Sequence, residues 1–334
     1  MNIVIPMAGM GKRMRPHTLT IPKPLIPLAG KPIVQRLCED IVKVTGEKVE
    51  EIAFIVGHFG KENEERLLNI AKTLGAEGKI YYQEEPLGTA HAIHCAKEAL
   101  HGKVTVAFAD TLFDAHFVLD TAQEGIIWTH CVEDPSVFGV VRKDEKGVIT
   151  GFVEKPQTFV SNEAIIGIYY FKDGDCLRRE LQYLLDNHVV KSGEYQLTDA
   201  LENMMKKGTH FVTGSVAEWL DCGNKNATVY THQRVLELKK DKEKLVSDTL
   251  QTKNSVIIPP CYIGKDVQIE NSIIGPHVSL GDGCRVNRSI ITDSVVQNKT
   301  ILSDAHISHS MIGSEVKYKG KPQEVSLGDY NEVE

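Results

Sequence analysis

Residues 1–33 read MNIVIPMAGMGKRMRPHTLTIPKPLIPLAGKPI, and the rest of the chain is organised around this stretch. Residues 3–5 (IVI) form an apolar run typical of a buried parallel strand. The run breaks at Pro6 into a turn that contains Gly9 and Gly11, and three cations follow within residues 12–15. Small residues at a tight turn let backbone N–H groups approach an anion closely, and a guanidinium suits phosphate. The stretch therefore predicts a strand that leads into an anion-binding loop.

Other interpretations of this loop fit less well. A dinucleotide-binding G-x-G-x-x-G needs a third glycine where Met14 stands. A P-loop needs a Ser or Thr after Gly-Lys, and Arg13 stands there instead. An isolated Gly-x-Gly is often only a surface turn with solvated cations. The full spacing, Gly9-x-Gly11-x-Arg13-x-x-Pro16 followed by Pro22-Lys23-Pro24, is more specific.

This spacing resembles the signature of the sugar-1-phosphate nucleotidylyltransferases, the enzymes that make NDP-sugars. The resemblance covers residues 1–240 and implies an α/β fold, a Rossmann-like nucleotidyltransferase domain with a mostly parallel sheet. It also implies that Ala8, Gly9 and Gly11 bind the nucleotide. Arg13 and Lys23 are expected to be catalytic, because their charges would neutralise phosphate groups.

Composition narrows the class of protein. The 334 residues suffice for two domains, and 42% hydrophobic content is ample for packed cores. A net charge of −7 without a basic stripe argues against nucleic acid as a partner. The seven cysteines are odd in number, scattered and without a C-x-x-C pair, which predicts reduced thiols. Since neither a signal peptide nor an apolar run of about 18 residues occurs, we expect a soluble cytoplasmic protein without membrane contact.

Apolar strands and amphipathic helices alternate along the first half of the chain. Such alternation predicts a mostly parallel sheet covered on both faces, whose ligands bind outside the carboxyl ends of the strands. The expected strands are residues 52–56, 80–82, 104–109, 126–132 and 165–170, and the expected helices are residues 34–44, 61–74 and 90–100.

The loop after residues 80–82 offers groups suited to a nucleotide base. Gln83 carries both a donor and an acceptor, and Gly88 permits a close approach of the backbone. Alone, a Gln in a turn is usually solvated, but the family resemblance implies that Gln83 and Gly88 line the base. The run 87–91 (LGTAH) favours the pyrimidine-reading members of the family, which transfer uridylyl or thymidylyl groups.

Two carboxylates are the expected magnesium ligands and are also expected to be catalytic. Asp110 follows the predicted strand 104–109, where a carboxylate is well placed for Mg²⁺, although a turn-forming Asp is the common alternative. The family has a Gly-Asp pair here, and Ala109 replaces that glycine. Asp221, within EWLDCGN, resembles the second metal carboxylate of the family. Whether the two carboxylates meet depends wholly on the fold.

A further set of residues resembles the sugar-phosphate site of the family. Gly139 lies in the segment FGVV, and Glu154 and Lys155 lie in a Glu-Lys-Pro triplet. The resemblance implies that Glu154 accepts hydrogen bonds from sugar hydroxyls and that Lys155, also catalytic, pairs with the phosphate. Gly167 is expected to leave room for the sugar. Taken singly, a Glu-Lys pair before Pro is only a turn.

Two helices are expected late in the catalytic domain. The segment 193–199 (GEYQLTD) should begin a helix with Thr198 or Asp199 as its N-cap. The resemblance implies that Glu194 and Asp199 help to shape the sugar pocket. From residue 224 to residue 250, a charged helix should lead out of the domain.

Beyond residue 250 the pattern of the sequence changes. Three series of apolar residues recur at hexad spacing: Ile257, Ile263 and Ile269; Ile274, Leu280 and Val286; Val295, Ile301 and Ile307. Hexad periodicity predicts a parallel β-helix, and it resembles the left-handed hexapeptide-repeat tail of longer nucleotidylyltransferases. We therefore divide the chain into a catalytic domain (1–235), a helical linker (236–253), a left-handed β-helix (254–313) and a polar tail (314–334).

The predicted β-helix is expected to serve packing and homo-oligomerisation. Some tails of this kind carry acyltransferase activity, but this repeat is short and lacks an obvious loop or a diagnostic histidine. His277, His306 and His309 are expected to be structural or solvated.

Taken together, the resemblance implies Mg²⁺-dependent transfer of a nucleotidyl group from an NTP to a sugar-1-phosphate. UTP or dTTP and glucose-1-phosphate are favoured. One alternative is a mannose-1-phosphate guanylyltransferase, because Lys23-Pro24-Leu25 also occurs in guanylyl-transferring relatives. A second alternative is a non-catalytic regulatory homologue that binds an NDP-sugar, which the full set of charged residues argues against. A bifunctional enzyme whose tail acylates is disfavoured by the short repeat.

Overall fold

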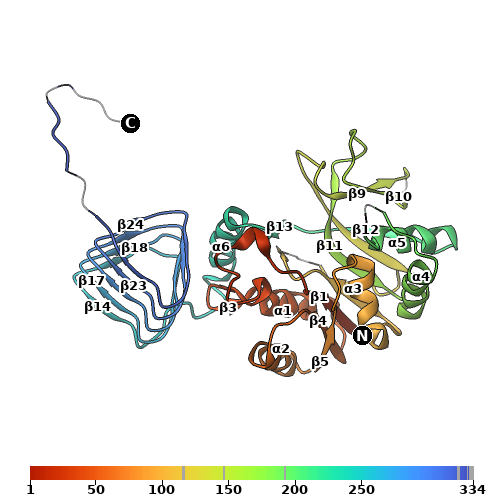
Figure 1. Cartoon of the computed structure of the whole chain (residues 1–334), viewed down its shortest axis with the longest axis horizontal. Coiled ribbons are helices and arrows are strands. Elements are labelled where there is room, and N and C mark those ends of the chain that lie inside the picture. The colour runs from red at the N-terminus through yellow and green to blue at the C-terminus, as the bar shows by residue number, and fades with distance from the viewer. Residues whose placement is uncertain (115–116, 146, 192, 322–323, 329, 331–334) are drawn as a thin grey trace. The chain divides into compact units, whose positions relative to one another are not determined.

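The computed structural model describes residues 1–114, 117–145, 147–191, 193–321, 324–328 and 330 (Figure 1). The chain forms two compact units, one of residues 1–26 and 31–224 and the other of residues 27–30 and 225–334. We call them the N-terminal unit and the β-helix unit. This division differs from the expected one, because the helix after residue 224 belongs to the β-helix unit and ends at Lys239, so that residues 236–253 do not form a helical linker.

The N-terminal unit is built on a sheet of which one half is parallel. β1 (Asn2–Pro6) lies between β6 (Val104–Ala107) and β4 (Glu51–Val56), and β5 (Glu77–Tyr82) follows β4. Each of these neighbours pairs in parallel. β1 and β4 are buried along their whole length, as strands covered on both faces must be. The Rossmann-like prediction is confirmed.

The other half of the sheet is antiparallel. β11 (Glu163–Phe171) runs antiparallel to β6, to β8 (Gly125–Cys131) and to β9 (Gly139–Lys143). β10 (Ile149–Glu154) pairs antiparallel with β9, and β12 (Phe211–Ser215) runs parallel to β8. The sheet is therefore mixed. This half differs from the expected parallel arrangement because β8 to β11 follow one another without crossover helices, which parallel neighbours need.

α1 and α2 confirm the helices expected near the N-terminus. α1 (Ile33–Thr45) begins after Pro32 and is followed by Gly46, whose φ of +61° is the left-handed conformation common after a helix. α2 (Lys61–Thr73) carries acidic residues in its first turn, where the helix dipole favours negative charge.

α3 (Thr89–Cys95), α4 (Gly174–Asp186) and α5 (Leu197–Lys206) pack against the sheet. α4 is capped by Asp173, whose carboxylate accepts a hydrogen bond from the backbone N–H of Cys176 at 3.0 Å. The core they share with the strands includes Ile93, Leu181, Leu201, Val4, Ala53, Val106 and Ile127.

Two helix boundaries differ from those expected. α3 stops short of residue 100 because Ala96 leaves the helical region (φ −102°, ψ 36°), and a 3₁₀ turn, η3 (Lys97–Ala99), follows. α5 is preceded by Gln196 at the N-cap position, so neither Thr198 nor Asp199 is the cap. Asp199 lies instead in the first turn of α5 and is buried.

Short elements complete the region around the sheet. They are η1 (Lys12–Met14), η2 (Lys23–Leu25), β3 (Lys31–Pro32), β7 (Thr111–Asp114) and β13 (Glu218–Asp221). β2 (Pro27–Leu28) belongs to the β-helix unit. β7 and β13 pair as an antiparallel ribbon.

The β-helix unit consists of stacked coils whose short strands form three parallel sheets, consistent with the predicted left-handed β-helix (Figure 1). The first sheet contains β14 (Gln251–Lys253), β17 (Gln268–Glu270), β20 (Arg285–Asn287), β23 (Ile301–Ser303) and β26 (Lys317–Lys319). The second contains β15 (Val256–Ile257), β18 (Ile273–Ile274), β21 (Ile290–Ile291) and β24 (His306–Ile307). The third contains β16 (Cys261–Ile263), β19 (Val278–Leu280), β22 (Ser294–Val296) and β25 (Met311–Ile312). β26 extends the repeat into the segment expected as a polar tail.

The last hexad series is displaced by one residue at its first two positions, whereas Ile307 packs against the core as predicted. Val296 and Leu302 form the core, with 1% and 0% exposure, in place of the predicted Val295 and Ile301. Ile301 is 37% exposed, although Val295 is also buried. The reason is that the coils are unequal, since the equivalent residues Ser272 and Ser289 are 17 residues apart, whereas Ser289 and its equivalent Ala305 are 16 residues apart. A strict six-residue period cannot follow a coil that has lost a residue.

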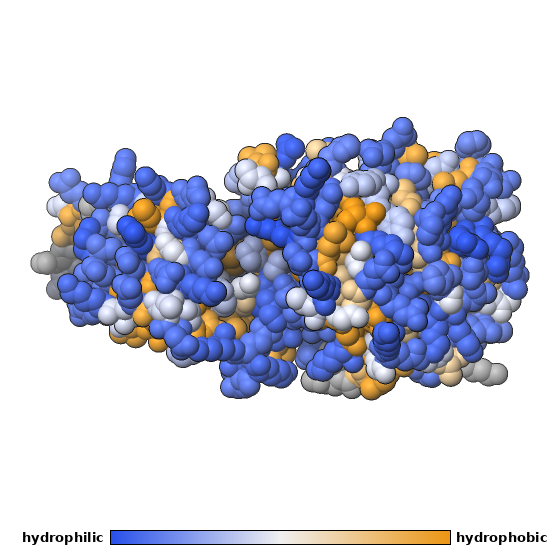
Figure 2. Space-filling model, turned by 90° about the horizontal axis from the view of Figure 1, so that it is seen from below, coloured by the Kyte–Doolittle hydropathy of each residue, from blue (hydrophilic) through white to orange (hydrophobic). Residues whose placement is uncertain are grey.

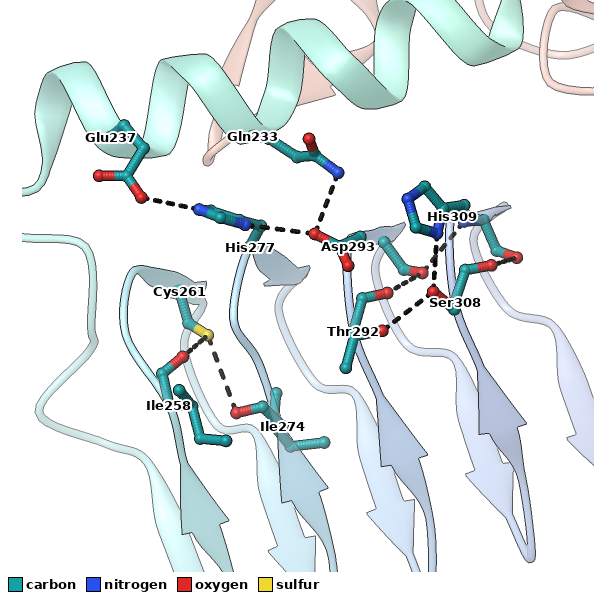
Figure 3. Close-up of polar contacts among 12 residues, drawn as sticks. Gln233, Glu237, Ile258, Cys261, Ile274, His277, Thr292, Asp293, Ser308 and His309 are labelled. Atoms are coloured by element: carbon teal, nitrogen blue, oxygen red, sulfur yellow. Dashed lines mark hydrogen bonds and ion pairs between the residues drawn. The ribbon is translucent and has the colours of Figure 1, made fainter.

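α6 (Lys225–Lys239) packs on the β-helix through a group of polar side chains (Figure 3). His277 lies between Glu237 of α6 and Asp293 of the next coil. Its Nε2 is 2.8 Å from Glu237 Oε1 and its Nδ1 is 3.2 Å from Asp293 Oδ1. Gln233 donates to the same oxygen of Asp293 at 3.0 Å. Each ring nitrogen of His277 thus has a carboxylate neighbour within the protein.

Figure 2 shows mainly hydrophilic side chains on the face it displays, with scattered apolar groups. In the part of the chain that the structure describes, no helix is long and apolar enough to cross a membrane. The seven cysteines are free thiols in the structure.

Candidate active site

A cleft of about 410 Å³ opens at the carboxyl ends of β1, β5 and β6. Parallel sheets bind their ligands at this edge. The loops after these strands, the start of α3 and the segment before α5 supply the lining, which includes Ala8, Gly9, Gly11, Arg13, Lys23, Gln83, Gly88, Asp110 and Glu194.

The turn after β1 brings backbone to the edge of the cleft. Gly11 has a φ of +58°, and a Cβ there would lie only 3.0 Å from Cβ of Lys23, so glycine is required. Thr18 Oγ1 donates to the carbonyl oxygen of Gly11 at 2.9 Å and fixes the turn. A Cβ at Gly9 would meet no described atom within 4 Å, so the chain there borders open space. Together with Arg13, this turn has the features of an anion-binding loop.

Lys23 and Asp110 form an ion pair in the cleft. Lys23 begins η2, and its Nζ lies 2.7 Å from Asp110 Oδ2. The side chain of Lys23 is 13% exposed and that of Asp110 is 35% exposed, so the carboxylate still faces the solvent of the cleft. The structure therefore brings together two predicted catalytic residues that are far apart in the sequence.

An antiparallel ribbon carries Asp221 to the same place. β13 pairs with β7 so that Asp221 lies opposite Thr111, the residue after Asp110. The backbone N–H of Cys222 donates to the carbonyl oxygen of Asp110 at 2.8 Å and continues the pairing. This ribbon could not be read from the sequence, because β7 is short and directly follows a strand-ending turn.

The two carboxylates repel each other electrostatically. Burial raises the pKa of Asp221, and the negative charge of Asp110 raises it further. The backbone N–H of Gly223 donates to Asp221 Oδ1 at 2.8 Å and works in the opposite direction. The positive charges of Lys23 and Arg13 also lower the pKa of Asp221. Four of the predicted charged residues thus share one electrostatic environment.

The donor set of this place fits a magnesium ion. Mg²⁺ prefers oxygen ligands and is commonly held by one or two carboxylates together with substrate phosphates. Asp110 and Asp221 supply two such carboxylates, whose mutual repulsion a divalent cation relieves. Within the described residues, no group of three or more His, Cys, Asp or Glu side chains could hold a metal ion.

Gln83 and Gly88 line the cleft beyond β5, the edge strand of the parallel half. Gln83 Nε2 donates to the carbonyl oxygen of Gly88 at 3.2 Å and lies 3.2 Å from Nδ1 of His91. Gly88 has a φ of +116°, and a Cβ there would lie 2.5 Å from the carbonyl oxygen of Tyr195. Gly88 is therefore required by contact with its own chain, a reason that local sequence does not reveal.

Gly139, Glu154 and Lys155 lie together on the antiparallel half of the sheet. Gly139 pairs with Glu154 across β9 and β10, and a Cβ at Gly139 would lie 2.9 Å from Glu154 Oε2. Lys155 has a φ of +44°, which is uncommon for a residue with a side chain, and its N–H donates to the carbonyl oxygen of Phe138 at 3.0 Å. Strained backbone of this kind is frequent at functional sites.

Glu154 is a second carboxylate with a perturbed pKa. Burial raises its pKa, the charge of Lys155 lowers it, and Glu194 and Asp199 raise it. Since Glu194 also lines the cleft, it connects the two regions. The family resemblance implies that Glu194 helps to shape the sugar pocket, and the sequence signal that points to it is the helix-initiating segment 193–199.

The predicted site residues therefore fall into two groups. Ala8, Gly9, Gly11, Arg13, Lys23, Gln83, Gly88 and Asp110 line the cleft, and Asp221 adjoins it through Gly223. Gly139, Glu154, Lys155 and Gly167 do not line this cleft. Gly167 lies where the pairing of β11 is interrupted, has a φ of +83°, and its carbonyl oxygen accepts from the N–H of Phe108 at 2.9 Å.

The fold is α/β, and its cleft, with cations and a glycine turn at the strand-to-loop edge, has the features of a phosphate-binding site. Residues 3–237 match the model of the nucleotidyl transferase family. The chain therefore belongs to that family, and by class it is a sugar-1-phosphate nucleotidylyltransferase.

Similar proteins carry names consistent with that class. The chain is 33% identical over 261 residues to the low-salt glycan biosynthesis nucleotidyltransferase Agl11 of Haloferax volcanii, covering 74% of this chain and 70% of that one. It is 36% identical over 188 residues to the mannose-1-phosphate guanylyltransferase catalytic subunit beta of Drosophila melanogaster, covering 54% of this chain and 50% of that one. The chain thus spans half the length of the latter relative.

A solved structure of UDP-glucose pyrophosphorylase complexed with UDP-glucose superposes with a TM-score of 0.59 at 25% identity. The match covers 71% of this chain and 98% of that one. The likeness bears out the nucleotidyltransferase fold.

Proposed function

We propose that this protein transfers a uridylyl or thymidylyl group from UTP or dTTP to a sugar-1-phosphate and releases pyrophosphate. Glucose-1-phosphate is the first candidate for the sugar substrate. The observation that carries the proposal is the convergence of Asp110 and Asp221 with Lys23 and Arg13 beside the turn after β1. Such a group of charges suits a metal-bound triphosphate.

The reaction itself demands positioning and charge neutralisation. A phosphate oxygen of the sugar-1-phosphate attacks the α-phosphorus of the NTP in line, the bond to the β,γ-diphosphate breaks, and pyrophosphate leaves. The attacking oxygen is already anionic, so a general base contributes little. Preorganised positive charge at the α-phosphate and at the leaving group therefore has the largest effect on the rate.

Each predicted catalytic residue has a role in this scheme. The backbone from Ala8 to Gly11 and the guanidinium of Arg13 bind the triphosphate, and Arg13 stabilises the pyrophosphate that leaves. Lys23 holds the α-phosphate, and Lys155 orients the phosphate of the sugar substrate. Asp110 and Asp221 would hold Mg²⁺, which when bound supplies positive charge at the reacting phosphate.

The order of strands suggests how the substrates lie along the sheet edge. Gln83 follows β5, two strands away from β1, which amounts to about 10 Å between the base contact and the phosphate loop. On the other side of β1, β6 leads to Asp110 and β11 lies next to it. The base therefore lies toward β5, the phosphates near β1 and β6, and the sugar toward β9, β10 and β11, where Gly139, Glu154, Lys155 and Gly167 would contact it.

A second candidate is transfer of a guanylyl group to mannose-1-phosphate. It is favoured by the identity of 36% to a relative named mannose-1-phosphate guanylyltransferase catalytic subunit beta. A regulatory homologue without activity is less consistent with the chain, because Arg13, Lys23, Asp110, Lys155 and Asp221 are all present.

The test is pyrophosphate release in the presence of Mg²⁺. UTP, dTTP, GTP, CTP and ATP are each combined with glucose-, mannose- and N-acetylglucosamine-1-phosphate. We expect one pair with UTP or dTTP to exceed the others clearly. GTP with mannose-1-phosphate as the best pair would establish the second candidate. Absence of release with every pair, together with NDP-sugar binding by calorimetry, would favour the regulatory homologue.

The β-helix also bears on assembly, and we propose that it supports a homo-oligomer. Val256, Ile273 and Ile290 lie in register on β15, β18 and β21. They are 55%, 39% and 42% exposed, so they form an outward-facing aliphatic column. A second copy of the chain would bury this column. Light scattering after size exclusion should give a multiple of the chain mass, and Ile273→Ser should reduce it; a monomer in both cases would refute the proposal.

A further inference from the structure

The side chain of Gln83 is held by two contacts within the protein. Its Nε2 donates to the carbonyl oxygen of Gly88 at 3.2 Å. The same Nε2 lies 3.2 Å from Nδ1 of His91, which projects from α3. An amide NH₂ group has two hydrogens and no acceptor capacity, so these contacts use both of them. The carbonyl oxygen Oε1 is then the group that Gln83 can offer to a ligand in the cleft.

This arrangement specifies the state of His91. Because the amide nitrogen can only donate, Nδ1 of His91 must accept, and its ring proton resides on Nε2. Burial lowers the pKa of His91, which favours the neutral ring, whereas the carboxylate and the backbone carbonyl of Glu85 raise it. His94, on the same helix, is affected electrostatically by His91 and also has a lowered pKa, mainly through burial.

We propose that His91 is a positioning residue that turns the carbonyl oxygen of Gln83 toward the nucleotide base and thereby selects bases with a ring N–H. Uracil, thymine and guanine carry such a donor beside their exocyclic oxygen. Cytosine and adenine present a ring nitrogen lone pair at the equivalent position. That nitrogen is a hydrogen-bond acceptor and would lie against Oε1 of Gln83, which is also an acceptor. This inference rests on the proposed function, since it assumes that the nucleotide base lies beside Gln83.

Binding of nucleotides without the sugar substrate tests the inference directly. Isothermal calorimetry with Mg²⁺ measures Kd for UTP, GTP and CTP with the wild-type chain and with two variants. His91→Leu keeps the approximate size but removes the acceptor. His91→Asn places an amide oxygen near the position of Nδ1 and is the matched control. For the wild type we expect UTP or GTP to bind about tenfold more tightly than CTP, the cost of one unsatisfied polar pair.

In His91→Leu the amide of Gln83 loses one of its two orienting contacts and keeps only the one with the carbonyl oxygen of Gly88. We expect the preference over CTP to fall, mainly through weaker binding of UTP or GTP, while CTP affinity changes little. His91→Asn should retain most of the preference. If His91 had a purely structural role, His91→Leu would instead weaken the binding of all three nucleotides to the same extent.

The pH profile supplies a second readout that does not depend on how the leucine variant folds. Protonation of His91 turns Nδ1 into a donor, so Gln83 would rotate and present its NH₂ group to the cleft. The preference of the wild type over CTP should therefore decline on acidification below the ordinary histidine pKa of about 6.5. It should stay constant over the same range in His91→Asn.

The outcomes separate this inference from the proposed function. Failure of every nucleotide to bind overturns both. Tight binding with equal affinity for UTP, GTP and CTP leaves the proposed site in place and overturns the role of His91. A preference that persists in His91→Leu with an unchanged pH profile also overturns it.

Discussion

Each unit of this protein contains a small group of charged side chains, and the two groups are built in opposite ways. In the N-terminal unit, Asp110 and Asp221 bring like charges to one cleft, and burial together with Asp110 raises the pKa of Asp221. In the β-helix unit, Glu237 and Asp293 lie on either side of His277, and each ring nitrogen contacts one carboxylate (Figure 3).

The difference separates a site from a structural contact. In the β-helix unit, His277 supplies a partner to both carboxylates from within the protein. In the N-terminal unit, burial and the charge of Asp110 raise the pKa of Asp221 despite the nearby charges of Lys23 and Arg13, and the Mg²⁺ proposed above would relieve this repulsion. Removing a charge from the first group should therefore affect turnover more than stability, and removing one from the second group should do the reverse.

The largest effect is expected for Asp221→Asn. The substitution keeps the size of the side chain and removes one of the two proposed metal ligands, so turnover should fall about 10³-fold, the range found when one preorganised electrostatic group is lost. The melting temperature should not decrease, because repulsion with Asp110 is relieved. Pyrophosphate release and thermal unfolding check the two parts.

The matched control for this prediction is Asp248→Asn. Asp248 lies on the surface and pairs with Lys244, and both side chains are mostly exposed. Exposed pairs contribute about 0–1 kcal/mol, so neither turnover nor melting should change measurably. If Asp221→Asn keeps a near-normal rate with saturating Mg²⁺, Asp221 is not a metal ligand and the assignment of the site fails.

Local sequence was sufficient for the parts of the site that one segment supplies. The turn at Gly9–Arg13 and the Pro22-Lys23-Pro24 loop carry their glycines, cations and prolines within a few residues of one another. Strands such as β1 and β4 could be predicted because both of their faces are buried, which makes them continuous apolar runs.

Contacts between distant segments could not be predicted in this way. The meeting of Asp110 and Asp221 depends on the β7–β13 ribbon, and the need for Gly88 depends on Tyr195. The contact of His91 with Gln83 likewise requires α3 to fold back on the loop after β5. Apolar periodicity carries no information about any of these pairings.

The β-helix offers the sharpest test of what periodicity can predict. Leu302 is a core residue and Ile301 is its partly exposed neighbour, the reverse of the hexad prediction. Leu302→Ala should lower the free energy of unfolding by about 2–5 kcal/mol, whereas Ile301→Ala should cost far less. Neither should alter the rate of pyrophosphate release at a temperature where the variant is folded. Equal losses in a urea titration would contradict the observed register.

A smaller effect is expected on stability, from changes of pH and of Mg²⁺ concentration at the group formed by Asp110 and Asp221. The raised pKa of Asp221 means that the folded, metal-free chain binds more protons than the unfolded chain at pH values between the two pKa values. Its free energy of unfolding should therefore decrease as pH rises through that window, which begins near the ordinary Asp value of about 3.9.

Thermal melts in EDTA from pH 4 to pH 8 check this sign. Relative to Asp221→Asn, the wild type should lose stability as the pH rises. Addition of Mg²⁺ at pH 7.5 should raise the melting temperature of the wild type more than that of the variant. An equal response of both proteins to Mg²⁺ would show that the ion binds elsewhere.

The smallest effect is expected for the group formed by Glu237, His277 and Asp293 in the β-helix unit. Hydrogen bonds from Lys240 and then from His277 lower the pKa of Glu237. A lowered carboxyl pKa contributes stability that is present above the unfolded value, about 4.3 for Glu, and is lost as pH falls through the folded pKa. Glu237→Gln should therefore lower the local stability of α6 at neutral pH. Amide hydrogen exchange in residues 225–239 should accelerate by up to about fivefold. This difference in exchange rate from the wild type should shrink in acid. Mass-spectrometric hydrogen exchange measures it, with Glu62→Gln on α2, an exposed carboxylate paired with Arg66, as the matched control. Because no part of the cleft is altered, turnover should be unchanged. Slower turnover with unchanged exchange would contradict the assignment of the Glu237–His277–Asp293 group to stability alone.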